Sequence, residues 1–172
     1  MDMKYTRMIR NKNWYLVVIM ILSIACASSG IPITSTPEDA SGTIARQLIP
    51  ILQELSKNKN ITIAIIPFGG PKGRPTNFGK KMSAMLQLKL LSQSWTFVER
   101  EHVEKVLNEQ LLASSGAIKE TDYIHAGTII GADYIVSGTT FYGKKALLSV
   151  KIINVKTSTV EGIAQVYIAF KE

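Results

Sequence analysis

The segment Ile61–Phe68 constrains the fold more than any other part of the chain, because it is apolar at almost every position. β-branched side chains such as isoleucine favour extended backbone, and a strand with one solvent-exposed face would alternate apolar and polar residues. The segment therefore predicts a central strand that is buried on both faces, as in a sheet with helices packed on it.

Segments with helical periodicity lie on both sides of this strand. One helix is predicted to begin at Thr36–Pro37, where a hydroxyl cap, a proline and acidic residues follow one another, and Pro50 should kink or divide it. Further helices are predicted after Thr76 and after Thr121–Asp122, the last closed by Gly131 as a C-terminal cap. A further helix is predicted between the last two, because apolar residues recur at helical spacing there as they do in the first two helices. These residues are Ile44, Leu48, Ile51, Leu52 and Leu55 in the first helix; Phe78, Met82, Met85, Leu86 and Leu90 in the second; and Val103, Val106, Leu107 and Leu111 in the further one.

The remaining segments have the patterns of strands. Residues 95–99 alternate like a short strand, and the last third of the chain contains three more, at 134–141, 146–155 and 160–170, separated by tight turns. We therefore expect an α/β fold: a single mixed sheet of about five strands with helices packed on it, in which β-α units precede a C-terminal antiparallel β-meander.

The N-terminus has the pattern of an export signal. Residues 1–13 carry four basic side chains and one acidic one, and the apolar run 14–25 is interrupted only by Ser23. A helix needs about 20 apolar residues to span a bilayer, so this shorter run with a basic flank predicts a signal peptide over 1–25. The alternative, a buried N-terminal helix, is disfavoured because the run is apolar on every side.

The residues that end the signal indicate a lipid anchor. Leu22–Cys26 resembles a bacterial lipobox, and Cys26 is the only cysteine in the chain. We expect Cys26 to be the lipid attachment site, carrying palmitate or a similar acyl chain; the alternative is an ordinary secretory signal with a coincidental cysteine. Ala27 follows the cysteine, which in enteric bacteria is the pattern of outer-membrane rather than inner-membrane lipoproteins. Residues 26–37 have the composition of a flexible tether, and 38–172 are expected to form the domain.

The net charge of the chain is smaller once the predicted signal is removed. Lysine and arginine number 20 against 13 acidic residues, a net charge of +7 that could indicate nucleic acid or an anionic membrane. Without residues 1–25, 16 basic and 12 acidic residues remain, which is a net charge of +4. We therefore expect no nucleic-acid partner.

One loop is a candidate for binding a ligand or a partner. The stretch 69–75 contains Lys72 and Arg74 and follows the buried strand, a position where β-α sheets offer ligand crevices. The alternative is a solvated connection. The following stretch, 74–81, lacks the first glycine and the Ser/Thr position of a phosphate-binding loop.

Other catalytic patterns are missing from the sequence. His102 and His125 have no second histidine or cysteine at metal-ligand spacing, and no serine lies in a Gly-x-Ser-x-Gly motif. We therefore expect no catalytic residues, no metal site and no cofactor, and a protein that is not an enzyme.

Two motifs carry a resemblance to a known family. The stretches 98–110, which contains Glu99-Arg100-Glu101, and 131–138, which contains Gly131-Ala132-Asp133, are similar to the curli-assembly (CsgG-like) lipoprotein superfamily. The FlgO-like flagellar lipoproteins and the penicillin-binding-protein activator lipoproteins look like relatives. The first motif joins a strand to a helix and the second is a tight helix-to-strand turn, so both are predicted to determine the fold.

The resemblance implies a function in the cell envelope. It implies a lipid-anchored protein on the periplasmic face of the outer membrane that acts as an assembly or scaffold component of a flagellar, curli-like secretion or cell-wall machine. Its partners would be other envelope proteins or further copies of itself, with membrane contact through the N-terminal lipid. The core elements consume nearly all residues after the signal, which leaves no room for the long hairpins of a membrane pore. The alternative function is a soluble periplasmic ligand-binding or enzymatic domain that uses the basic loop at 69–75.

Overall fold

A computed structural model describes residues 30–113 and 120–169 of the chain, without the side chains of 110–113 and 120; Cys26 and the predicted signal lie outside this part. In the part described, no helix is both long enough and apolar enough to cross a bilayer. The elements, in chain order, are β1 (Ile33–Thr34), α2 (Pro37–Leu55), β2 (Thr62–Ile65), α3 (Asn77–Leu90), β3 (Thr96–Phe97), α4 (Arg100–Ala113), α5 (Glu120–Ile129), β4 (Tyr134–Phe141), β5 (Ala146–Asn154) and β6 (Val160–Ile168).

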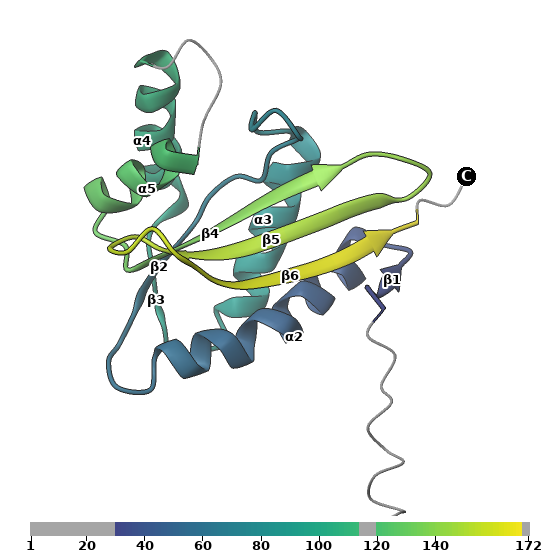
Figure 1. Ribbon diagram of the computed structural model, residues 1–172, viewed down its shortest axis with the longest axis horizontal. Helices are drawn as coiled ribbons and strands as arrows, with labels where there is room; N and C mark the ends of the chain where they lie inside the picture. The colour runs from purple at the N-terminus through teal and green to yellow at the C-terminus, as the bar shows by residue number, and fades with distance from the viewer. Residues whose placement is uncertain (1–29, 114–119, 170–172) are drawn as a thin grey trace, which may run out of the picture. The chain divides into compact units, whose positions relative to one another are not determined.

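These strands form one six-stranded mixed sheet in the order β1-β6-β5-β4-β2-β3 (Figure 1). β2 pairs in parallel with β3 and β4, whereas β4, β5 and β6 form an antiparallel meander. The predicted fold class is therefore confirmed. The sixth strand, β1, pairs in parallel with β6 and comes from residues that we assigned to the tether, so this part of 26–37 belongs to the sheet.

The helices cover the two faces of the sheet unequally (Figure 1). α2 and α3 pack on one face against inward side chains of β2, β4, β5 and β6, and this forms the larger core. α4 and α5 pack on the other face against Ala64, Ile66 and Ile135, so they cover β2 and β4. β2 contributes to both cores, which confirms a strand buried on both faces, although this strand covers only Thr62–Ile65 of the segment 61–68. Every buried residue of the two cores lies between Ala40 and Ile168.

The structure confirms the predicted helix ends at Thr36 and Gly131, whereas α5 begins at Glu120, just before the predicted Thr121–Asp122, and Pro50 behaves differently from the prediction. The Thr36 hydroxyl accepts a hydrogen bond from the Asp39 N–H at 3.1 Å, which caps α2. Gly131, after α5, has a φ of +69°, the left-handed conformation that glycine adopts without strain. Pro50 does not divide α2, which continues to Leu55. Pro50 lies on the exposed side of the helix, so the backbone hydrogen bond that it removes faces water.

Candidate functional site

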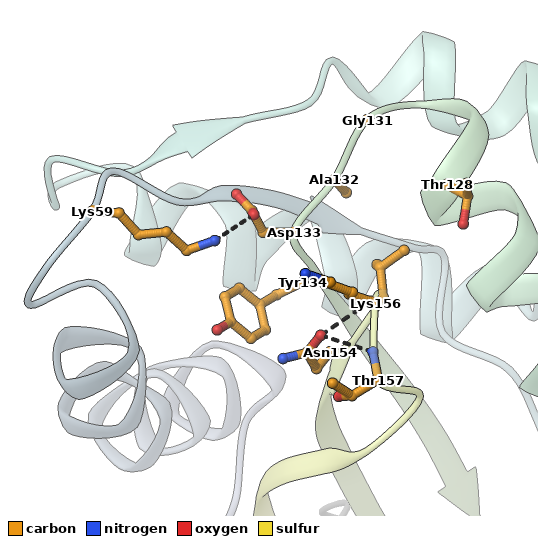
Figure 2. A pocket seen from close by; sticks show the side chains of 10 residues that line it. Lys59, Thr128, Gly131, Ala132, Asp133, Tyr134, Asn154, Lys156 and Thr157 are labelled. Carbon is orange, nitrogen blue, oxygen red and sulfur yellow. Dashed lines mark hydrogen bonds and ion pairs between the residues drawn. The ribbon is translucent and has the colours of Figure 1, made fainter.

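A cavity of about 570 Å³ lies at the end of the sheet where β2 and β4 begin (Figure 2). Asp133, from the predicted Gly-Ala-Asp motif, lines it. One carboxylate oxygen of Asp133 accepts from the Lys59 ammonium at 2.6 Å, and the other accepts from the Thr62 N–H at 2.9 Å. Asp133 therefore fixes the first residue of β2 beside the first residue of β4.

The electrostatics of this cavity follow from the same contacts. The hydrogen bond from Lys59, followed by that from the Thr62 N–H, lowers the pKa of Asp133 below its ordinary value. The hydrogen bond to Asp133 raises the pKa of Lys59. Both groups are therefore charged at neutral pH and paired with each other.

The turn between β5 and β6 forms another wall of the cavity. The Asn154 side-chain oxygen accepts from the N–H groups of Lys156 and Thr157, at 3.0 and 3.2 Å, and Ser158 has a φ of +60°. The Asn154 amide donates to Glu161 at 3.2 Å. These hydrogen bonds stabilise the turn. The contacts in the cavity therefore stabilise the fold, and this agrees with the prediction that the Gly-Ala-Asp motif determines the fold.

Arg100, from the other motif, connects helices on opposite faces of the sheet. Its Nε donates to the Glu104 carboxylate at 2.9 Å, and its Nη2 donates to the Lys80 carbonyl at 3.1 Å. Lys80 lies in α3 and Glu104 in α4, so the guanidinium ties the two helices together beyond the end of β2. Lys80 and Glu104 also line a smaller cavity of about 200 Å³.

The basic loop at 69–75 is a closed turn. The Gly73 N–H donates to the Gly70 carbonyl at 2.9 Å, and the Gly70 N–H donates to the Arg74 carbonyl at 3.0 Å. The Tyr123 hydroxyl donates to the Gly73 carbonyl at 3.0 Å, and burial, followed by the charge of Asp122, raises the pKa of Tyr123 to about 12. The side chains of Lys72 and Arg74 are exposed on this turn, and neither lines the two cavities described above.

α4 and α5 leave half of their face of the sheet uncovered, and the sequence did not predict this surface. We call it the open face, and in the described part of the chain no helix lies over it (Figure 1). Ile163, in β6, is 53% exposed there, opposite Lys151 of β5. The open face consists of outward side chains of β5 and β6: Leu147, Ser149, Lys151, Ile163, Gln165 and Tyr167.

The two histidines line neither of the cavities described above. His102 is exposed on α4 and His125 is exposed on α5. Within 30–113 and 120–169, no group of three or more histidine, cysteine or acidic side chains is arranged to hold a metal ion.

Known structures share this fold. The C-terminal domains of LpoB from Salmonella enterica and Escherichia coli are each 12% identical to the chain, with TM-scores of 0.54 and 0.53; each match covers 75% of this chain and 97% of that domain. The solution structure of E. coli LpoB is 11% identical, with a TM-score of 0.55, over 84% of this chain and 74% of LpoB. At such low identities these matches show the fold alone.

Sequence comparison identifies the family. No curated protein matches the chain in sequence. The family model of the curli production assembly/transport component CsgG matches residues 54–146, which is more than half of the chain and includes both predicted motifs. The resemblance expected from those motifs is therefore confirmed, and the chain belongs to the CsgG family.

Proposed function

We propose that this protein is an envelope lipoprotein that works by binding other envelope proteins, as an assembly or scaffold component of a machine associated with the outer membrane. The observation that carries the proposal is the family match over residues 54–146, since the matched family is named for a curli assembly and transport component. The predicted signal at 1–25, the lipid attachment site at Cys26 and the domain at 38–172 agree with it.

The open face is the surface that we assign to the protein partner. Its centre is polar, where Gln165 donates to the Ser149 hydroxyl at 3.3 Å, and Ile163 and Leu147 lie on either side along the strands. Protein interfaces combine apolar contacts with a limited number of hydrogen bonds in this way. The partner is therefore expected to cover an exposed isoleucine and to hydrogen-bond near Gln165.

The contacts of the charged groups favour binding over catalysis. Asp133, Lys59 and Arg100 are each bonded into the fold. The alternative function, ligand binding or catalysis at the loop 69–75, is less well supported, because the loop closes on itself and its two basic side chains line neither cavity.

Photo-crosslinking in cells tests the binding surface. A photoreactive amino acid at Ile163 should yield a discrete adduct with an exported protein, or with a second copy of the chain, and reciprocal labelling of that partner should reproduce it. Gln53, exposed on α2, is the matched control position. Equal adducts at both positions, or none at either, would contradict the proposed surface.

Labelling with radioactive palmitate tests the lipid anchor. The native chain should incorporate the label and stay with the membrane fraction, and Cys26→Ala should abolish the labelling. An unlabelled native chain, or a variant that is labelled equally, would show that Cys26 is not acylated.

A further inference from the structure

One end of the sheet gathers aromatic, aliphatic and basic side chains that are exposed or half-buried. β2, β4 and β6 all finish at this end, and β1 enters beside the last residues of β6. We call it the tether end, because the N-terminal part of the described chain joins the sheet here through β1. Its members are Ile33, Lys72, Arg74, Phe78, Phe141, Tyr142, Lys144 and Lys145.

Two exposed apolar members, Phe141 and Ile33, lie in one cross-strand row although they come from distant parts of the sequence. Cross-strand register places Phe141 opposite Leu147, Leu147 opposite Tyr167, and Tyr167 opposite Ile33. Phe141 is 46% exposed and Ile33 is 57% exposed. A row of apolar side chains therefore crosses four strands at this end, and its two middle residues, Leu147 and Tyr167, also form the edge of the open face.

The hairpin between β4 and β5 adds a further aromatic contact. Tyr142 meets Phe78 of α3 edge to face, with ring centroids 6.5 Å apart. Tyr142 is nevertheless exposed, because the contact covers only part of its ring. The aromatic surface of the tether end therefore extends from the sheet to the start of α3.

The charge at the tether end is mainly positive. Lys72 and Arg74 lie on one turn, and Lys144 and Lys145 lie on the hairpin between β4 and β5; all four are exposed. Two acidic residues begin α2 nearby: Asp39 accepts from the Thr36 hydroxyl at 2.6 Å, and Glu38 pairs with Lys89 at 3.5 Å. Basic charge next to exposed aromatic rings is the composition that favours the surface of an anionic membrane.

A lipid on Cys26 would hold this end near a membrane. Ile33 is the seventh residue after Cys26. A fully extended segment of this length spans at most about 25 Å, so the lipid would keep Ile33 within that distance of the bilayer.

We propose that the tether end docks on the anionic phospholipid leaflet in which the Cys26 lipid is inserted. Tyr142 and Phe141 enter the headgroup region, where aromatic rings are favoured, and Lys144 and Lys145 contact lipid phosphates. This inference rests on the proposed lipid anchor for its geometry, whereas the charge and the exposed rings belong to the described fold.

Tryptophan quenching tests the contact in the lipid-bearing protein. After removal of residues 1–25, Trp95 is the only tryptophan, and it lies just before β3, away from the tether end. The processed native protein and a Tyr142→Trp variant are reconstituted in vesicles of brominated phosphatidylcholine, with and without phosphatidylglycerol. The tryptophan introduced by Tyr142→Trp should be quenched, more strongly with phosphatidylglycerol, and Trp95 should not be. Equal quenching at both positions would overturn the proposal.

Sedimentation with the same vesicles separates this docking from the lipid anchor. The chain from residue 26 with Cys26→Ala carries no acyl chain and retains both cores, which lie between 40 and 168. Lys144→Ala/Lys145→Ala should weaken its binding to phosphatidylglycerol vesicles about 30-fold, since each basic residue near an anionic surface contributes roughly a factor of five.

The matched control is Lys57→Ala/Lys156→Ala, which removes the same charge at the opposite end and should change binding less than about threefold. Equal losses in the two pairs, or no dependence on phosphatidylglycerol in the parent, would overturn the docking. Failure of palmitate labelling together with retained, lysine-dependent vesicle binding would overturn only the lipid anchor and support the docking surface.

Discussion

The two ends of the sheet use their polar side chains in opposite ways. At the end where β2 and β4 begin, Asp133 accepts hydrogen bonds from Lys59 and from the Thr62 N–H. Asn154 accepts a backbone hydrogen bond there that stabilises the turn between β5 and β6. At the tether end, Lys144 and Lys145 extend from a hairpin beside exposed aromatic rings. The comparison shows that a charge can specify the fold at one end, whereas similar charges at the other end remain accessible to a partner.

The largest expected effect tests whether the backbone at the tether end is loosely packed or whether only its side chains are exposed. A Cβ atom on Gly79 would overlap the carbonyl oxygen of Phe68, so Gly79→Ala must push α3 away from the end of β2. We expect the free energy of unfolding in urea to fall by about 3 kcal/mol. Gly143→Ala, at the same end, meets nothing closer than the Lys145 carbonyl oxygen at 3.5 Å and should have no effect. Equal stability of the two variants would show that the backbone here is loose.

The next effect tests the opposite end. Asp133→Ala leaves the Thr62 N–H without its acceptor and should lower the free energy of unfolding by about 2 kcal/mol. Lys59→Ala removes only the exposed ion pair and should cost less than about 1 kcal/mol. Urea titration of both variants measures the difference. Equal losses would mean that the ion pair, and not the backbone contact, stabilises this end.

A smaller effect concerns the contact that holds the basic turn at 69–75. Tyr123→Phe removes the hydrogen bond to the Gly73 carbonyl and should cost about 1 kcal/mol. Because the pKa of Tyr123 is raised to about 12 in the folded protein, its contribution is present below about pH 10 and declines as the pH rises. Chemical unfolding at neutral and alkaline pH should show the stabilities of the native chain and the Tyr123→Phe variant converging at high pH; a constant difference would contradict this.

The smallest effect is the acid dependence of Asp133. Because its pKa is lowered in the folded state, its charge stabilises the fold above about pH 4, and that contribution is lost as the pH falls through the folded pKa. The pair is partly exposed, so we expect less than about 1 kcal/mol. Asp133→Asn, which retains an acceptor for the Thr62 N–H, should flatten this part of the pH dependence in urea titrations. An unchanged pH dependence would argue against the expectation.

The sequence predicted the elements that carry a strong local pattern. The β-branched residues of 61–68 and the apolar spacing of α3 and α4 are local signals, and so is the glycine that ends α5. β1 was missed because two residues in a segment rich in Pro and Ser have no strand pattern of their own. Ile33 joins the sheet only through Tyr167, far along the chain.

The site residues show the same limit. The Gly-Ala-Asp motif was recognised, but its partner Lys59 lies 74 residues earlier, and no local pattern links the two. Ile163 lies in a strand that is apolar at most positions, a pattern typical of burial on both faces. Its exposure depends on how far α4 and α5 extend over the sheet, which is a property of helix placement.

The way in which the chain enters the sheet sets how it would respond to mechanical load. β1 is held at the edge by hydrogen bonds from the Tyr167 N–H to the Pro32 carbonyl and from the Ala169 N–H to the Thr34 carbonyl, each 2.8 Å long. A pull on the residues before Pro32 therefore loads these two bonds before it reaches any core residue. Under such a load we expect β1 to detach from the edge of the sheet first, while the other strands and the helices packed on them stay folded.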